Sequence, residues 1–148
     1  MSGPSPFNPR LIGFDCPACE AFADLTAARS TCPACAKPLV ARYDLERLRG
    51  ELDREDLARR GSDLWRYRAL LPFAADFPAV RLGEGGTPLL PLARLAADLG
   101  VAELWLKEES GNPTQSFKAR GLALAVSGAV AFGIRAIALP SAGNAGSA

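Results

Sequence analysis

Two loops of the sequence combine residue types that could hold a cofactor. Residues 107–118 read KEESGNPTQSFK and residues 140–146 read PSAGNAG, and each loop lies between a strand-like and a helix-like segment. Lys118 in the first loop offers an amine that can bond to a carbonyl carbon. Asn144 in the second offers an amide donor and acceptor, and backbone N–H groups at a helix start bind anions. Together the loops predict a cofactor site.

Composition narrows the chemistry open to these loops. The 148 residues include no histidine, which excludes Ser-His-Asp and Cys-His catalytic arrangements and any histidine-ligated metal. Only three lysines occur, Lys37, Lys107 and Lys118, so an amine nucleophile must be one of them. The net charge of +1 gives no reason to expect nucleic acid or an anionic membrane as a partner.

The four cysteines form two identical tetrapeptides, CPAC at residues 16–19 and again at residues 32–35. Two such turns can each present two thiolates to one tetrahedral zinc ion. The alternatives are redox-active dithiols or unrelated buried cysteines, but a redox CxxC normally begins a helix in a thioredoxin-like context, which neither pair has. The repeat therefore predicts a structural zinc site ligated by Cys16, Cys19, Cys32 and Cys35.

Six elements are expected to position these motifs. They are a strand over residues 38–43, a helix capped by Asp44 and running to about Arg60, a helix over 89–100, a strand over 103–107, a helix over 116–132 closed by Gly133, and an apolar strand over 136–139. The last three predict a right-handed crossover between parallel strands. Ligand sites in such sheets gather beyond the carboxyl ends of the strands, so the two loops should meet there.

These elements predict an α/β chain in four parts. They are a flexible arm at residues 1–13, a zinc ribbon at 14–43, a helical connector at 44–80, and the first part of an α/β domain at 81–148. One crossover and two strands cannot make a covered parallel sheet, and the chain stops at Ala148 in what looks like the first turn of a helix. We therefore expect the front part of a longer protein.

Nothing in the sequence indicates export or membrane insertion. The N-terminal residues lack the apolar core of a signal peptide. The longest apolar stretch, residues 122–134, is too short to span a bilayer. A cytoplasmic location is the expectation.

Three segments resemble, in order and approximate spacing, the motifs of pyridoxal-phosphate enzymes of the tryptophan synthase β-like fold (fold type II). They are LGEGGTPL at 82–89, KEESGNPTQSFKARGL at 107–122 and SAGNAGSA at 141–148. The CPAC pairs, the YDL at 43–45 and the WRYRALLP at 65–72 narrow the likeness to the threonine synthases that carry a zinc ribbon. The resemblance implies an incomplete domain of this fold, preceded by a small ribbon.

The resemblance also implies a lyase of threonine biosynthesis that converts O-phosphohomoserine and water to threonine and phosphate. Lys118 matches the lysine that bonds to the cofactor and later shuttles protons, and Phe117 flanks it against the cofactor ring. Asn144 matches the asparagine that hydrogen-bonds the ring 3-hydroxyl. The part of the family's fold that holds the cofactor phosphate would lie beyond Ala148, so this chain alone is expected to be inactive.

Substrate contacts follow from the same resemblance. Ser141 resembles the segment that receives the substrate carboxylate, and Lys107 and Ser116 stand where contacts to the substrate phosphate are reasonable. The complete protein is expected to be a homodimer.

Two residues depart from the family pattern. Gln115 stands where the family usually has glycine, and Ala119 stands where many members have aspartate. Two alternatives to a threonine synthase stay open. One is a serine/threonine dehydratase or another enzyme of this fold, against which the ribbon argues. The other is a non-catalytic zinc-ribbon fragment, which Gln115 and the abrupt end of the chain favour.

Overall fold

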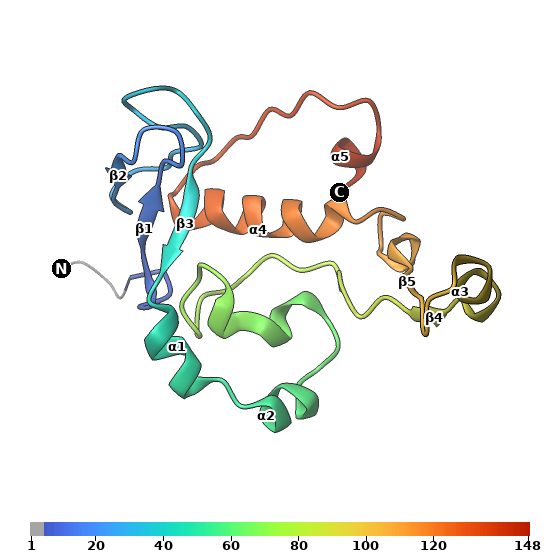
Figure 1. The fold of residues 1–148 in the computed structure, drawn as a ribbon. Helices are drawn as coiled ribbons and strands as arrows, with labels where there is room; N and C mark the ends of the chain where they lie inside the picture. The colour runs from blue at the N-terminus through green and yellow to red at the C-terminus, as the bar shows by residue number, and fades with distance from the viewer. Residues whose placement is uncertain (1–4) are drawn as a thin grey trace. The chain divides into compact units, whose positions relative to one another are not determined.

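The computed structural model describes residues 5–148. The chain folds into two compact units, which can be followed by residue number in Figure 1. The first contains residues up to Gly61 with residues 65–79 and 127–137, and the second contains residues 62–64, 80–126 and 138–148. Spatial contacts define these units, so the four-part division expected along the chain stays a prediction.

A three-stranded antiparallel sheet lies in the first unit. Its strands are β1 (Leu11–Asp15), β2 (Phe22–Ala23) and β3 (Val40–Tyr43), with β1 in the centre (Figure 1). Phe14 of β1 pairs with Ala23 on one side and with Ala41 on the other. β3 confirms the strand expected over residues 38–43. The first CPAC turn directly follows β1, and the second precedes β3.

Residues 7–13 are not the flexible arm that the sequence suggested. Leu11 begins the central strand and is buried, and the Asn8 amide donates hydrogen bonds to the carbonyl oxygens of Ala69 and Leu71 at 2.9 and 2.8 Å. The prolines near the N-terminus suggested a flexible arm. The contacts that order these residues join positions about sixty residues apart, so no local sequence pattern reveals them. Residues 1–4 of the expected arm lie outside the described residues.

The single helix expected from Asp44 to about Arg60 is wrong, because the segment forms two short helices, α1 (Leu45–Glu51) and α2 (Arg54–Arg59). Asp44 caps α1 as expected by accepting a hydrogen bond from the Arg47 N–H at 3.0 Å. Leu52 is extended, and the Asp53 carboxylate accepts from the Glu55 N–H at 3.0 Å. An aspartate that caps a new helix in this way competes with continuation of the old one.

Aromatic side chains pack in the core of the first unit. Trp65, in the 3₁₀ segment Leu64–Leu70, has its ring centroid 6.0 Å from that of Phe73, and Phe73 stacks on Phe77 at 5.1 Å. Trp65, Phe73 and Leu48 are buried. Burial of rings of this size supplies much of the apolar contact area of a small core.

The second unit contains a small two-stranded antiparallel sheet whose strands are connected by a helix. β4 (Leu89–Pro91) pairs with β5 (Trp105–Lys107), and α3 (Ala93–Leu99) connects them. The helix expected over 89–100 therefore starts late, because residues 89–91 pair with β5 instead. The strand expected over 103–107 is confirmed in its second half, though its partner is antiparallel.

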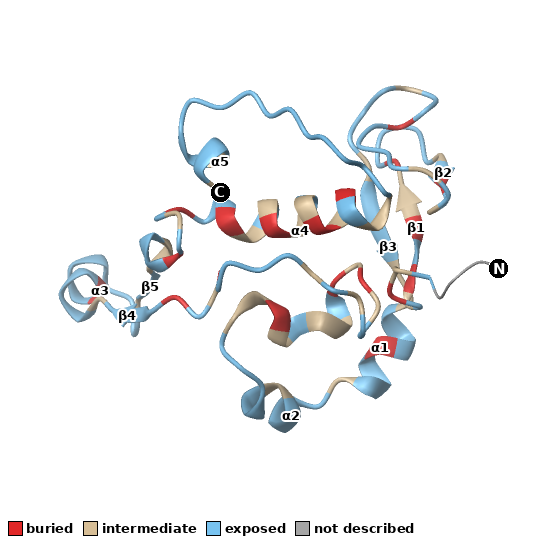
Figure 2. Ribbon diagram, turned by 180° about the vertical axis from the view of Figure 1, so that it is seen from behind, coloured by how far each residue is buried: buried red, intermediate tan, exposed pale blue. Residues whose placement is uncertain are grey.

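The long helix α4 (Lys118–Ala131) falls within the expected range 116–132. Ala119, Ala123 and Ser127 recur every four residues and are buried, so they mark one face of α4 (Figure 2). A short helix, α5 (Asn144–Ser147), follows the second predicted site loop.

The apolar strand expected over residues 136–139 is not formed. These residues are irregular, and Ile137 and Leu139 are exposed. A strand needs a hydrogen-bonded neighbour, and no strand in the described part of the chain pairs with this segment. The predicted parallel crossover is therefore absent from residues 5–148. Within the same residues, no helix is long and apolar enough to cross a membrane.

Candidate functional site

The four cysteines cluster at the end of the three-stranded sheet. The ligand atoms of Cys16, Cys19, Cys32 and Cys35 all lie within 4.8 Å of one another. The sulfur atoms of Cys16 and Cys35 are 3.5 Å apart, and those of Cys19 and Cys32 are 3.6 Å apart. None of the four forms a disulfide. The two CPAC turns thus bring four thiols together, as their spacing predicted.

The thiol of Cys16 sits in an environment that favours its ionised form. Burial acts to raise its pKa, but hydrogen bonds from the backbone N–H groups of Ala18 and Cys19, together with those from neighbouring thiols, lower it to about 7. The backbone N–H of Ala34 similarly donates to the Cys32 sulfur at 3.4 Å. Backbone donors of this kind support thiolate ligands.

In the second unit, a cavity of about 300 Å³ is lined by the start of α4 and by the loop at residues 140–145. Three of the predicted site residues line it, namely Lys118, Ser141 and Asn144. The two loops that the sequence indicated thus contribute to one cavity. They do so without the parallel sheet that was expected to bring them together.

Ser141 shapes the loop that lines this cavity. Its hydroxyl oxygen accepts hydrogen bonds from the backbone N–H groups of Gly143 at 3.0 Å and Gly146 at 2.8 Å. Gly143 has φ = 145°, a conformation that L side chains rarely adopt, so the turn depends on a glycine there. The turn leads directly into Asn144 at the start of α5.

The other three predicted site residues are not in the lining of this cavity. The ring of Phe117 is 63% exposed. Ser116 is buried, and its hydroxyl oxygen accepts a hydrogen bond from the Lys118 backbone N–H at 3.3 Å. The Lys107 ammonium donates to the carbonyl oxygen of Thr87. Ser116 and Lys107 therefore contact protein atoms in this structure.

A hydrogen-bonded network around Glu109 holds the segment that carries Lys118. The Glu109 carboxylate accepts from the Arg120 guanidinium at 2.7 and 2.8 Å, from the Thr87 hydroxyl at 2.7 Å and from the Asn112 amide at 3.0 Å. Arg120 also donates to the Thr87 hydroxyl at 3.0 Å. The hydrogen bond from Arg120, followed by that from Thr87, lowers the pKa of Glu109 from 4.5 to about 2.

Asn112 extends this network to the glycine-rich loop at residues 82–89. Its side-chain oxygen accepts from the Gly85 N–H at 3.0 Å, and its amide nitrogen donates to the Glu109 carbonyl oxygen at 2.8 Å. Gly85 has φ = 102°, and a Cβ there would lie 2.5 Å from the Leu64 backbone nitrogen. Only glycine fits this position, so the loop's shape and its contact with Asn112 depend on each other.

Sequence reasoning missed this network. Glu109 and Arg120 are eleven positions apart in the chain and come from a loop and a helix, so no periodic pattern links them. The available signal was the pair of opposite charges on either side of Lys118, inside a segment already selected for its lysine.

Gln115 has a conformation that favours glycine. Its φ is 53°, in the left-handed region, and its N–H donates to the Asn112 carbonyl oxygen at 2.8 Å. This is the position at which the sequence departs from the expected family pattern. The backbone keeps the turn that glycine would allow, at a cost of about 1–2 kcal/mol for a side chain in that region.

Comparison with known families finds one match in the C-terminal half of the chain. Residues 80–148 match the family described as "Pyridoxal-phosphate dependent enzyme". This match implies the tryptophan synthase β-like fold for the segment, in agreement with its mixture of helices and strands.

Three curated proteins extend the likeness toward the N-terminus. The threonine synthase of Methanocaldococcus jannaschii is 36% identical over 129 residues, which cover 87% of this chain and 32% of that protein. The threonine synthase of Methanosarcina acetivorans is 37% identical over 118 residues, which cover 80% and 28%. That of Halalkalibacterium halodurans is 44% identical over 85 residues, which cover 57% and 24%.

The chain spans a third or less of the length of these three relatives. No solved structure matches it.

Proposed function

We propose that this chain supplies the lysine-bearing part of a threonine synthase-like enzyme. That enzyme would convert O-phosphohomoserine and water to threonine and phosphate with pyridoxal phosphate. The observation that carries the proposal is the cavity of about 300 Å³ that Lys118 shares with the 140–145 loop, inside a segment of the matching family. The threonine synthases among the relatives favour this reaction over that of a dehydratase or a non-catalytic fragment.

The groups that line the cavity fit the cofactor. Lys118 is exposed and supplies the amine, and Asn144 supplies an amide suited to the ring 3-hydroxyl. When bound, pyridoxal phosphate supplies an electron sink for the carbon atom that loses a proton. In this proposal the Lys118 amine holds the cofactor and then moves protons, as a general base and acid.

The neighbouring residues would orient the reactants. Ser141 holds the loop that receives the substrate carboxylate, since its oxygen fixes two backbone N–H groups. Phe117 has an exposed ring that can flank the cofactor. The phosphate contacts expected of Lys107 and Ser116 stay predictions, as do a homodimer in the longer protein and a cytoplasmic location.

We also propose that Cys16, Cys19, Cys32 and Cys35 bind a structural zinc ion in a small ribbon. A tetrahedron with Zn–S bonds of about 2.3 Å has sulfur–sulfur edges of about 3.8 Å. The measured 3.5 and 3.6 Å lie close to this edge, and the antiparallel strands β1 and β3 flank the cluster. Four protein ligands leave no open position, so the ion would stabilise the fold and take no part in the reaction.

Borohydride trapping tests the proposed cofactor site. The chain is incubated with pyridoxal phosphate and reduced, and the modified lysine is mapped by peptide mass spectrometry. With only Lys37, Lys107 and Lys118 as candidates, selective modification of Lys118 supports the proposal. Equal modification of all three lysines, or none, contradicts a formed site.

A Lys118→Ala variant provides the matched control. It should lose the visible absorbance of bound cofactor and keep the far-ultraviolet circular dichroism of the unaltered chain. Absorbance that persists in the variant would show that Lys118 is not the cofactor lysine.

A further inference from the structure

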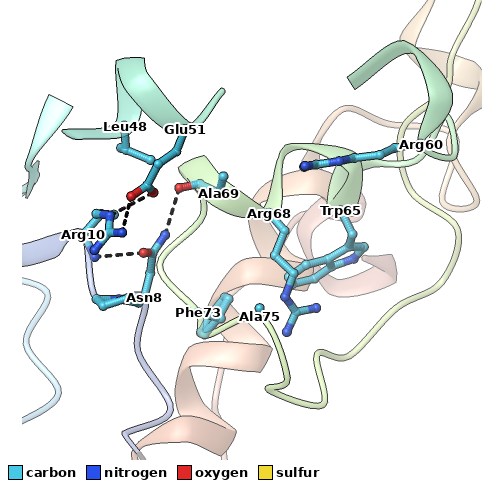
Figure 3. A pocket seen from close by; sticks show the side chains of 11 residues that line it. Asn8, Arg10, Leu48, Glu51, Arg60, Trp65, Arg68, Ala69, Phe73 and Ala75 are labelled. Atoms are coloured by element: carbon cyan, nitrogen blue, oxygen red, sulfur yellow. Dashed lines mark hydrogen bonds and ion pairs between the residues drawn. The ribbon is translucent and has the colours of Figure 1, made fainter. Parts of the chain in front are cut away.

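A second cavity lies in the first unit and shares no residue with the cavity of Lys118. Its volume is about 460 Å³, within the range of about 300–1,000 Å³ typical of small-molecule sites. The residues just before β1, helix α1, the C-cap residue of α2 and the segment at residues 65–75 contribute its lining (Figure 3). The proposed lyase reaction uses none of these residues.

Buried apolar groups form one part of the lining. Leu48 and Phe73 are each 2% exposed and Trp65 is 5% exposed, so these side chains are held in place by the core. The ring centroids of Trp65 and Phe73 are 6.0 Å apart. Such a surface can receive an aromatic ring or a short alkyl group with little rearrangement.

Positive charge forms the other part of the lining. The lining contains three arginines and one carboxylate, so its net formal charge is +2. These residues are Arg10, Arg60, Arg68 and Glu51. The Arg10 Nε donates to a Glu51 carboxylate oxygen at 3.0 Å, and an Arg10 Nη contacts the other oxygen (Figure 3). This pair neutralises itself, and Arg60 adds a further positive charge to the lining.

Backbone carbonyl groups accept hydrogen bonds from both Arg68 and Arg60. The Arg68 guanidinium lies 5.6 Å from the centre of the Trp65 ring and donates to the Ala74 carbonyl oxygen at 2.8 and 3.0 Å. Arg60 donates from one Nη atom to the Arg66 carbonyl oxygen at 3.1 Å, which is the one hydrogen bond that its guanidinium makes among the described residues. A guanidinium has five N–H donors, so Arg60 keeps donors for an anion.

We propose that this cavity binds a small organic anion, with a carboxylate or phosphate group at Arg60 and an apolar body against Trp65 and Phe73. Charge and shape together favour this class, since an anionic group would pair with the Arg60 guanidinium while an apolar body contacts Trp65 and Phe73. The site is independent of the proposed lyase function and lies within one unit of the chain.

Tryptophan fluorescence can report on this cavity directly. The chain has two tryptophans, Trp65 in the lining and Trp105 in the second unit, so a Trp105→Phe background leaves Trp65 as the single reporter. The probes are phenylacetate, phenyl phosphate and the neutral isostere phenylacetamide. We expect the Trp65 fluorescence to change saturably with either anion at millimolar concentration. The affinity for the amide should be at least about fivefold weaker. The tighter of the two anions identifies the preferred head group.

Two variants separate charge from shape. Arg60→Gln should weaken binding of the anions by about fivefold or more. Arg54→Gln, in the helix that ends just before Arg60 but outside the lining, should leave binding unchanged. Ala75→Phe places a ring at an exposed rim position and should abolish binding of all three probes. Circular dichroism establishes that each variant is folded.

Three outcomes would overturn the proposal. They are the absence of saturable binding, equal binding of phenylacetate and phenylacetamide, and unchanged binding by both Arg60→Gln and Ala75→Phe. A fluorescence change that follows protein concentration instead of probe concentration would place a second copy of the chain in the cavity and would equally overturn it.

Discussion

The guanidinium of Arg120 and the carboxylate of Glu109 make two parallel hydrogen bonds, Nε to Oε2 at 2.7 Å and Nη2 to Oε1 at 2.8 Å. About a quarter of each side chain is exposed, at 27% and 25%. Arg120 lies two residues after Lys118 in the first turn of α4, so this pair fixes that turn to the loop before it. A two-point contact constrains orientation as well as distance.

Glu109→Gln should therefore destabilise the chain and loosen the Lys118 site. A glutamine cannot accept both guanidinium bonds, and hydrogen bonds to charged groups contribute about 1.5–3 kcal/mol. We expect a decrease of that size in the free energy of unfolding, measured by urea denaturation. Asp98→Asn on α3 is the control, because that exposed side chain takes no part in the network. Equal stability of the two variants would contradict a structural role for the pair.

Acid should weaken the folded state through the same residue. The pKa of Glu109 is lowered in the folded chain from 4.5 to about 2. Its stabilising effect is complete above the unfolded value and is lost as the pH falls from 4.5 toward 2. Between about pH 5 and about pH 3 the free energy of unfolding should thus fall more steeply for the unaltered chain than for Glu109→Gln.

The matched comparison for this pH effect is Glu108→Gln. The pKa of Glu108 is also lowered, by hydrogen bonds from the Ser110 side chain and backbone, but Glu108 has no guanidinium partner. Its variant should keep most of the acid sensitivity of the unaltered chain. Identical pH profiles for Glu109→Gln and the unaltered chain would rule out Glu109 as the source.

Gln115→Gly should stabilise the chain. Gln115 has φ = 53°, and glycine adopts this conformation without the side-chain penalty, so we expect a gain of up to about 1 kcal/mol after the larger entropy of the unfolded glycine chain is subtracted. Gln115→Ala is the control, since it shortens the side chain but keeps the Cβ responsible for the strain. The midpoint of urea unfolding should rise for glycine only. A higher midpoint for Gln115→Ala as well would show that the glutamine atoms beyond Cβ, and not the Cβ itself, cause the destabilisation.

Removal of one cysteine should release the zinc ion. Elemental analysis of the unaltered chain, purified under reducing conditions, should give about one zinc per chain. Cys19→Ser should lose most of that zinc and lower the thermal midpoint, because the metal contributes folding free energy. Lys118→Ala should retain the zinc, since the two sites share no residue. A zinc-free unaltered chain would disprove the metal site.

Local sequence signals were reliable where the chain's own neighbours supply the physics. The duplicated CPAC turns predicted the sulfur cluster because the two cysteines of each turn are three residues apart, so the backbone itself brings each pair close. Asp44 caps α1, as the sequence predicted, through a side-chain hydrogen bond that reaches only three residues along the chain. The position of α4 likewise followed from its local composition.

Local sequence signals did not predict which strands pair with one another. The apolar composition of residues 136–139 resembles a buried strand, yet a strand forms only where a partner donates and accepts hydrogen bonds. Leu89–Pro91 was expected to be helical and became a strand because β5 lies beside it. In both places the outcome depends on whether a strand from elsewhere in the chain lies alongside, which composition alone does not specify.

By itself, the sequence determined the residue types available for chemistry: three lysines, four paired cysteines and no histidine. It also determined the two loops from which Lys118 and Asn144 come. Only the tertiary structure decided that Glu109 pairs with Arg120 and that Asn8 and Trp65 line a common cavity. The physical reason is that these contacts depend on where distant segments meet in space, which neither residue type nor local periodicity specifies.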